Sequence, residues 1–354
     1  MKIVFLGLSI TSSWGNGHAT NYRALVRELT ARGHDVLFLE RDVPWYAEQR
    51  DLPEPPWGRT ELYNSLEELE RHRDDLAAAD LVVVGSYVPE GIAVAKRVLE
   101  RAGGAVAFYD IDTPVTLGKL RRGDTEYLSP GLVGRFDLYL SFTGGPTLEV
   151  LEEEFGARRA VAFHCLVDPE AYRPRSGETP RWDLGYLGTY SDDRQPALER
   201  LLIEPARRDT RAAFAVAGPQ YPDEIAWPEN VERIEHVAPG DHPVFYASQR
   251  FTLNVTRAEM RAAGWSPSVR LFEAAACGVP VISDRWDGLE EIFTPGEEIL
   301  VADSADDVLR YLTETGEDRR LALAERARAR VLAEHTAARR CEQLEEEVAG
   351  VAAR

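Results

Sequence analysis

Two charged residues, Arg270 and Glu273, lie where charge is costly, in the segment GWSPSVRLFEAAACGVPVIS (264–283). Ser266 and Ser268 can begin a helix there, and a glycine and a proline end it. Arg270 falls in the first turn, where the helix dipole disfavours a cation, and Glu273 lies in a helix that is apolar nearly all round. A surface Arg–Glu pair at this spacing is worth about 0.2–0.5 kcal/mol, too little to justify burying both charges. A bound nucleoside diphosphate explains both, with the helix N-terminus and Arg270 on the diphosphate and Glu273 on the ribose hydroxyls.

A second anion-binding loop is predicted in LGYLGTYSDDRQPALERLL (184–202). Gly188 follows an apolar strand-like run, and Arg194 opens a helix-like segment. Asp192 and Asp193 would repel a phosphate, so we expect them to cap that helix. The phosphate contact is then left to Arg194 and to the backbone of Gly188 and Thr189.

The opening loop, SSWGNGHATNYRALVRELTARGHDVLFLERD from Ser12, resembles a dinucleotide fingerprint at first sight. Gly15 and Gly17 precede an amphipathic helix, and Glu40 ends the next strand, where an acid would bind a ribose. However, the first strand ends well before these glycines, and Thr20 occupies the position of the third glycine. The loop is therefore too long for the tight turn that a nicotinamide or flavin site needs.

We expect the loop to place His18 instead. His18 lies beyond the carboxyl end of the first strand, where open α/β sheets bind ligands. With a reference pKa of about 6.5, a histidine can remove a proton from an acceptor hydroxyl. In FYDIDTP, Asp110 and Asp112 follow another strand, and Asp112 could orient the imidazole. Two alternatives remain for this pair: Asp112 caps the helix opened by Pro114, or the D-x-D spacing binds a metal, which no further ligand cluster supports.

An aromatic acceptor rim is predicted beside His18. The segment RDVPWYAEQRDLPEPPWG (41–58) carries Trp45, Tyr46 and Trp57, whose faces suit sugars and flat aglycones. The predicted acceptor-binding residues are Trp14, Asn16, Gly17, Trp45 and Tyr46. The alternative is a loop that only packs on the surface.

Apolar runs of strand length alternate with helical segments, which is typical of parallel α/β architecture. The runs are KIVFLGL, DVLFLE, DLVVVGS, AVAFYDI, FDLYLSF and RAVAFHC, then WDLGYLG, AAFAVAG, VERIEHV, FTLNVT, VPVIS and EEILVA. The count is too high for an eight-stranded barrel, and a barrel leaves the Pro-rich centre unexplained. We predict two Rossmann-like, doubly wound parallel-sheet domains that face each other across a cleft. The predicted parts are an acceptor-side domain 1–166, a linker 167–181, a donor domain 182–318 and a helix 319–354 that packs back across the domains.

Composition excludes several classes of function. The net charge of −19 argues against nucleic acid or an anionic membrane as the main partner. No stretch has the length of a membrane span, and the N-terminal KIVFLGLSI lacks the flanks of a signal peptide. Cys165, Cys277 and Cys341 form neither a disulfide framework nor a metal pair, so we expect a reducing cytoplasm. The oligomeric state is not predicted.

These segments together resemble GT-B glycosyltransferases. The resemblance rests on the paired domains, on GNGHATNYRALVRELTARGHDV and on SPSVRLFEAAACGVPVIS, and it is strongest for the bacterial group with the CgeB spore-protein type of C-terminal domain. FYDIDTPVTL, VDPEAYRP and DGLEEIFTPGEEILV extend it over nearly the full chain. It implies a nucleotide-sugar donor on the second domain, an acceptor on the first, and transfer without a metal or other cofactor.

The resemblance also assigns roles to individual positions. It places the donor ribose on Glu273 and a general base at His18. It implies a diphosphate loop formed by Ser266, Pro267, Ser268, Val269 and Arg270. It implies a glycine loop at Gly188 to Arg194. It also implies that the backbone of His236, Val237 and Ala238 reads the base. Retaining relatives carry a further Glu eight positions before the ribose Glu. Here that position is Trp265, which favours inversion through His18.

The sequence therefore predicts a glycosyltransferase that moves a sugar from a nucleoside-diphosphate sugar to a hydroxyl or amine. A nucleotide-sugar epimerase on the same frame is one alternative, and it would convert a donor without any acceptor. A non-catalytic coat or scaffold protein is another, and it would have no donor affinity. The presence of both Arg270 and Glu273 argues against the scaffold.

Overall fold

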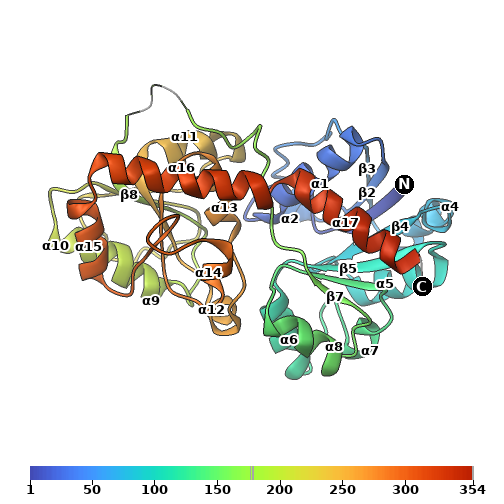
Figure 1. The fold of residues 1–354 in the computed structure, drawn as a ribbon. Helices are drawn as coiled ribbons and strands as arrows, with labels where there is room; N and C mark the ends of the chain where they lie inside the picture. The colour runs from blue at the N-terminus through green and yellow to red at the C-terminus, as the bar shows by residue number, and fades with distance from the viewer. Residues whose placement is uncertain (176, 178, 353–354) are drawn as a thin grey trace. The chain divides into compact units, whose positions relative to one another are not determined.

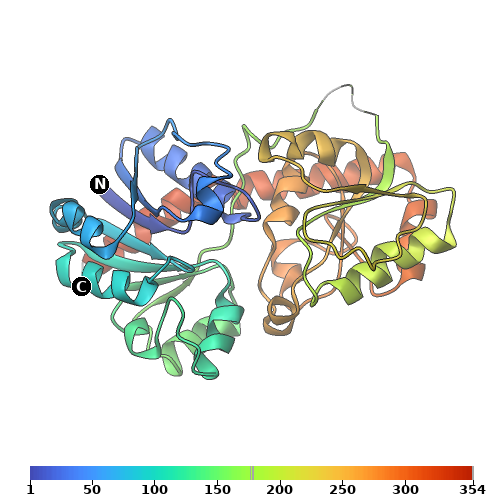
Figure 2. The ribbon, with the colours of Figure 1, turned by 180° about the vertical axis from the view of Figure 1, so that it is seen from behind.

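The computed structural model describes residues 1–175, 177 and 179–352. Residues 176 and 178 of the predicted linker, and residues 353 and 354 of the predicted last helix, lie outside this part. The chain forms two compact units (Figures 1 and 2). One contains Met1–Leu166 together with the C-terminal segment from Ala337, and the other contains Val167–Thr336.

The first unit is built on a seven-stranded parallel sheet with the order β3-β2-β1-β4-β5-β6-β7. Its strands are β1 Lys2–Gly7, β2 Asp35–Arg41, β3 Arg59–Tyr63, β4 Leu81–Gly85, β5 Ala105–Asp110, β6 Leu138–Ser141 and β7 Ala160–Ala162. Six of them match the apolar runs of the sequence, with β2 one residue longer than its run DVLFLE. The seventh, β3 (RTELY), has no such run because it pairs only with β2 at the sheet edge and is largely solvated.

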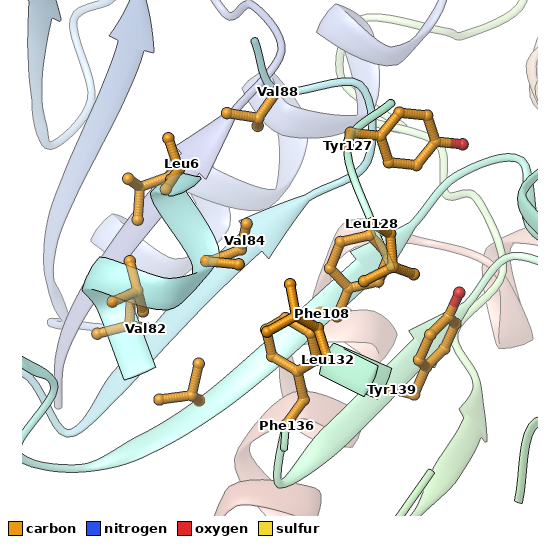
Figure 3. Packing of buried hydrophobic residues seen from close by; sticks show 14 of the residues in the cluster. Leu6, Val82, Val84, Val88, Phe108, Tyr127, Leu128, Leu132, Phe136 and Tyr139 are labelled. Atoms are coloured by element: carbon orange, nitrogen blue, oxygen red, sulfur yellow. The ribbon is translucent and has the colours of Figure 1, made fainter. Parts of the chain in front are cut away.

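Helices cover both faces of this sheet, as its continuously apolar strands require. They are α1 His18–Ala31, α2 Pro44–Ala47, α3 Leu66–Leu69, α4 Arg73–Ala77, α5 Gly91–Arg101, α6 Thr113–Arg121, α7 Pro130–Val133, α8 Pro146–Glu153 and α17 Ala337–Ala352, with a 3₁₀ turn Glu70–His72. On one face, strand residues such as Leu6, Val84 and Phe108 pack with residues of α5 and α7 in a single core (Figure 3). On the other face, α1 packs against α17.

The C-terminal segment differs from the single helix that we predicted for 319–354. It forms two helices, α16 Glu317–Glu334 in the second unit and α17 in the first. The break has a local cause: Thr336 forms a parallel bridge with Val167, whose N–H donates to His335 O (2.9 Å). Ion pairs Arg32–Glu345 (2.9 Å) and Arg159–Glu347 fix α17 within the first unit.

The second unit has a six-stranded parallel sheet with the order β10-β9-β8-β11-β12-β13. Its strands are β8 Trp182–Leu187, β9 Phe214–Ala217, β10 Val231–Ile234, β11 Gln249–Asn254, β12 Val281–Ser283 and β13 Leu300–Val301. Each overlaps a predicted run, and β11 begins two residues before its run FTLNVT. Its other helices are α9 Gln195–Leu198, the π-helical η2 Glu199–Ile203, α10 Glu204–Arg208, η3 Pro239–Asp241, α11 His242–Ala247, α12 Ala258–Ala263, α13 Val269–Ala276, α14 Leu289–Ile292 and α15 Ala305–Glu314. Residues of α9, α10 and α15 pack on one face, and α11 and α13 contact the strands from the other side.

Strand order defines a switch point in each sheet. The chain leaves β1 toward β2 and later returns to place β4 on the other side of β1. In the second sheet, β8 lies between β9 and β11 in the same way. Ligands of open α/β sheets bind outside the carboxyl ends of the strands at such points. Both predicted site loops, 8–17 and 188–194, begin there.

Candidate active site

Arg270 lies at the switch point of the second sheet. Its Nε donates to Leu187 O (2.6 Å) and its Nη1 to Asn254 Oδ1 (2.8 Å), so it joins the carboxyl ends of β8 and β11. Its guanidinium carbon lies 4.6 Å from the ring centroid of Tyr186. The side chain is buried. Its guanidinium is contacted by Leu187, Asn254 and Tyr186, in place of the Arg270–Glu273 ion pair considered from the sequence.

The helix that carries Arg270 begins as predicted. Ser268 is the N-cap of α13, and its hydroxyl accepts a hydrogen bond from the N–H of Arg270 (3.4 Å). Ser266, expected as a second cap, instead donates to Met260 Sδ (3.0 Å). Pro267 is buried, and Val269 is the first residue of the helix. The N-terminus of an eight-residue helix therefore opens beside the guanidinium.

Gly188 is needed for this close approach. A Cβ at this position would lie 2.6 Å from Tyr186 Oη and 2.8 Å from Arg270 Nη2. The following residue, Thr189, accepts a hydrogen bond from Arg194 Nη2 (2.7 Å). Within the described residues, Arg194 Nε is buried without a hydrogen-bond partner. Two guanidinium groups thus flank the backbone loop that follows β8.

We predict from the sequence that Asp192 and Asp193 cap the helix that follows them. The structure differs, because neither acid caps α9. Asp193 Oδ2 accepts the N–H of Ala258 (2.8 Å), the first residue of α12. Asp192 Oδ1 accepts a hydrogen bond from Tyr190 Oη (2.5 Å). The reason is geometric: the carboxylate of Asp193 reaches the neighbouring helix N-terminus, whose unpaired N–H groups need an acceptor. The loop acids are thereby used within the fold.

Glu273 lies one turn after Arg270 and is also buried. Its Oε2 accepts a hydrogen bond from Tyr246 Oη (3.1 Å) and lies 3.7 Å from His242 Nδ1. Burial, and then the charge of Glu273, raise the pKa of Tyr246 and of Tyr172 well above the usual tyrosine value. Both tyrosines therefore stay protonated, and Tyr246 is the one that donates to the carboxylate. The other oxygen, Oε1, is not used by these contacts.

The predicted base-reading segment follows β10. The Val237 carbonyl accepts a hydrogen bond from His242 Nε2 (3.2 Å), and Ala238 is the N-cap of η3. His236 precedes them in the same loop. Sequence reasoning missed His242, Tyr246 and Tyr172, which surround Glu273. Tyr172 had one visible signal, as the isolated aromatic in the predicted linker, and His242 had another, as a histidine in the turn after the base-reading strand.

Trp265 has a strained backbone. Its φ is +45°, which is unusual for a bulky residue. Its N–H donates to Asp287 O (2.6 Å), and its indole Nε1 donates to Glu291 Oε1 (2.8 Å). A Cβ on Gly288 would lie 2.5 Å from the indole ring. These contacts hold the segment that leads into the Ser268 cap.

In the first unit, Glu40 shapes the opening loop. It is fully buried at the end of β2, and its Oε2 accepts from Ile10 N (2.7 Å) and Thr11 N (3.0 Å). Its Oε1 accepts from Thr11 Oγ1 (2.6 Å) and Ser9 Oγ (3.1 Å). Both carboxylate oxygens are thus used by the loop, so the feature that had favoured a dinucleotide ribose has a structural role.

Glu40→Ala should lower the free energy of unfolding by about 2–6 kcal/mol. It leaves two buried backbone N–H groups without an acceptor, at about 1–3 kcal/mol each. Urea denaturation measures the change, with the exposed Glu48→Ala as the control. A loss below about 1 kcal/mol would contradict this role.

His18 is the first residue of α1, and the loop before it is built around Asn16. Asn16 Oδ1 accepts the N–H of His18 (3.0 Å), and Asn16 itself is buried. Acceptor binding by Asn16 stays a prediction, and in the structure its side chain shapes the turn that presents His18. The His18 ring centroid lies 6.3 Å from that of Phe142, and the exposed Gly17 is the N-cap.

Asp112 lies at the N-cap of α6, after β5. Its Oδ2 accepts a hydrogen bond from Tyr87 Oη (2.9 Å), and Tyr87 has a left-handed backbone with φ +62°. Asp110 is fully buried below it and accepts from Tyr139 Oη (2.5 Å) and Thr116 Oγ1 (2.9 Å). Burial raises the pKa of Asp110 to about 6. Of the two acids, Asp112 is the one placed near the surface.

The aromatic side chains of the predicted acceptor rim differ in exposure. Trp45, in the short helix α2, is 56% exposed. Trp14, Tyr46 and Trp57 are half-buried, and burial raises the pKa of Tyr46 to about 12. Trp45 is therefore the member of this group with the most free surface.

The described residues contain no cluster of three or more His, Cys, Asp or Glu side chains arranged to hold a metal ion. In the same residues, no helix has the length and apolar character needed to cross a membrane.

Comparison with known proteins identifies the class of domain. Residues 194–346 match a family model described as glycosyl transferase-like. No curated protein sequence matches the chain. The matched part covers the second unit from Arg194 onward and most of α17, and it is similar to a glycosyl transferase-like domain.

Solved structures extend the similarity to the whole chain. Sucrose-phosphate synthase from Thermosynechococcus elongatus is 14% identical with a TM-score of 0.71, and the match covers 100% of both chains. HepE of Anabaena, in complex with UDP and glucose, is 14% identical with a TM-score of 0.73 over 99% of this chain and 100% of that one. An alpha-glucosyltransferase in complex with UDP-glucose and DNA is 12% identical with a TM-score of 0.72 over 98% of each chain. The two parallel-sheet units therefore have the GT-B fold, as predicted.

Proposed function

We propose that this protein transfers a sugar from UDP-sugar to a hydroxyl or amine acceptor. The observation that carries the proposal is Arg270, buried at the switch point of the second sheet between the Gly188 loop and the N-terminus of α13. HepE and the alpha-glucosyltransferase are seen with UDP or UDP-glucose, which supports UDP as the nucleotide. The proposal includes membership of the CgeB-type group.

The donor site would act by stabilising the leaving group. When the bond between the sugar and the diphosphate breaks, negative charge develops on the diphosphate. Arg270, Arg194 and the N–H groups at the start of α13 supply the opposite charge, which supports transfer without a metal. Glu273 Oε1 would accept hydrogen bonds from the ribose hydroxyls.

The acceptor would be activated in the first unit. In the proposed step the acceptor oxygen or nitrogen attacks the anomeric carbon, the bond to the diphosphate breaks, and His18 takes the acceptor proton. Asp112 would stabilise the imidazolium that forms. With Trp265 in place of a second glutamate, we propose inversion at the anomeric carbon.

The acceptor itself is proposed only by class. Trp45 offers an exposed aromatic face for a sugar or a flat aglycone. The net charge of −19 supports an acceptor other than nucleic acid, although the alpha-glucosyltransferase is seen with DNA. Three buried free cysteines support a cytoplasmic location.

Glu273→Ala should raise the Kd for UDP by about 10- to 100-fold, because a hydrogen bond to a charged group is worth about 1.5–3 kcal/mol. Calorimetric titration with UDP and 2′-deoxy-UDP measures it. Wild type should lose affinity for the deoxy ligand, whereas the variant should bind both alike. Glu317→Ala, at an exposed glutamate that pairs with the buried Arg320, is the matched control. An unchanged UDP affinity in Glu273→Ala would remove Glu273 from the site.

A further inference from the structure

His242 connects the two parts of the site that would read the nucleoside. Its Nε2 lies 3.2 Å from Val237 O, in the segment after β10. Its Nδ1 lies 3.2 Å from Tyr172 Oη and 3.7 Å from Glu273 Oε2. Tyr246 Oη, one turn further along α11, donates to the same Glu273 oxygen (3.1 Å). One imidazole thus contacts both the proposed base-reading backbone and the residues around the proposed ribose carboxylate.

The contacts define which ring nitrogen of His242 donates a hydrogen bond and which accepts one. A carbonyl oxygen can only accept, so Nε2 carries the hydrogen toward Val237 O. In the neutral ring, Nδ1 then accepts from the Tyr172 hydroxyl. Because the peptide group is planar and trans, a Val237 carbonyl directed at His242 sends the N–H of Ala238 to the opposite side. His242 therefore fixes the orientation of one peptide donor in this segment.

We propose that His242 is a positioning residue that couples base recognition to ribose recognition and sets the preference for the base. This rests on the proposed function, since it assumes that a nucleotide binds along Glu273 and residues 236–238. A peptide N–H held in one orientation can donate to a carbonyl oxygen of the base. Where the base carries an amino group instead, two donors face each other and no hydrogen bond forms. Uracil and cytosine have the same shape, but at one ring position uracil carries a carbonyl oxygen and cytosine an amino group. The geometry therefore favours UDP over CDP.

The test measures UDP, CDP and 2′-deoxy-UDP affinities of the full chain by calorimetric titration. Wild type should bind UDP at least tenfold more tightly than CDP. His242→Leu should lower UDP affinity about tenfold, bring the UDP-to-CDP ratio close to one, and weaken discrimination against 2′-deoxy-UDP. His242→Gln, which keeps a donor at the Nε2 position, should retain most of the preference. Melting temperatures of both variants establish that each is folded.

Tyr246→Phe separates coupling from a local effect on Glu273. It removes one hydrogen bond to the carboxylate and leaves Val237 O–His242 in place, so it should weaken ribose discrimination while the UDP-to-CDP ratio stays that of wild type. An unchanged ratio in folded His242→Leu, or a wild-type ratio near one, would overturn the inference while UDP binding itself upheld the proposed function. Absence of nucleoside diphosphate binding by wild type would instead contradict the proposed function, and the inference with it.

Discussion

Arg270→Gln should lower kcat for sugar transfer by about 10²- to 10³-fold and weaken UDP binding. Removing one preorganised donor at a site of developing negative charge costs about 2.7–4 kcal/mol in the transition state. Glutamine is chosen because its amide can still donate to one of the two acceptors that Arg270 holds, Leu187 O and Asn254 Oδ1. An alanine would leave both buried acceptors unpaired, which would lower the free energy of unfolding by about 1–3 kcal/mol for each. A loss of activity in that variant could then come from unfolding.

The control for Arg270 is Arg250, which lies on β11, the strand that Arg270 contacts at its other end. Arg250, near the start of β11, donates to Asp183 Oδ1 (2.9 Å), whereas Arg270 binds Asn254 at the end of that strand. Arg250→Gln removes a similar charge at the opposite end of the strands and should leave kcat within about twofold. Steady-state kinetics with UDP-sugar measure both variants. Near-normal turnover in Arg270→Gln would exclude Arg270 from stabilising the leaving group.

His18→Ala should lower kcat by about 10²- to 10⁴-fold, the range for loss of a general base, and leave the Kd for UDP unchanged. The separation is expected because His18 lies at the start of α1 in the first unit, whereas the proposed donor residues lie in the second. Single-turnover transfer and UDP titration on the same preparation measure the two effects. Asn16 shapes the turn through its contact with the His18 backbone, which survives the substitution.

A matched histidine in the same unit tests whether the effect is specific. His34 lies in the turn before β2 and contacts Glu345 Oε1 (2.7 Å) in α17. His34→Gln should change stability without lowering kcat more than about twofold. Full turnover in His18→Ala would remove it as the base, and an equal loss in both variants would indicate a general effect on the unit.

The fold could be predicted from the sequence because most of its strands are buried on both faces. Twelve apolar runs marked the strands other than β3, whose charged RTELY segment is solvated at an edge. The last helix was predicted as one element, since its mixed-charge pattern gives no sign of the bridge between Thr336 and Val167. Such a long-range pairing leaves no periodic signal in either segment.

The candidate donor site was predicted from residues that break a local rule. Arg270 in a first helical turn and Glu273 in an apolar helix are both anomalies, and each is buried in the structure. Their protein partners could not be predicted: Leu187, Asn254, His242 and Tyr172 come from other elements that tertiary folding brings together. Glu40 shows the reverse case, since its position suited a cofactor while its four hydrogen bonds fix a loop.

The most direct test of the central claim is a thermal-shift screen of wild type and Glu273→Ala against UDP, GDP, dTDP, ADP and NAD. A ligand at 100 times its Kd stabilises by about 2.7 kcal/mol, enough to raise Tm by several degrees. The site described here predicts a shift with UDP in wild type that is lost in Glu273→Ala, and none with NAD. A shift with NAD alone would mean that the loop after β1 binds a dinucleotide and that the proposed donor site is wrong.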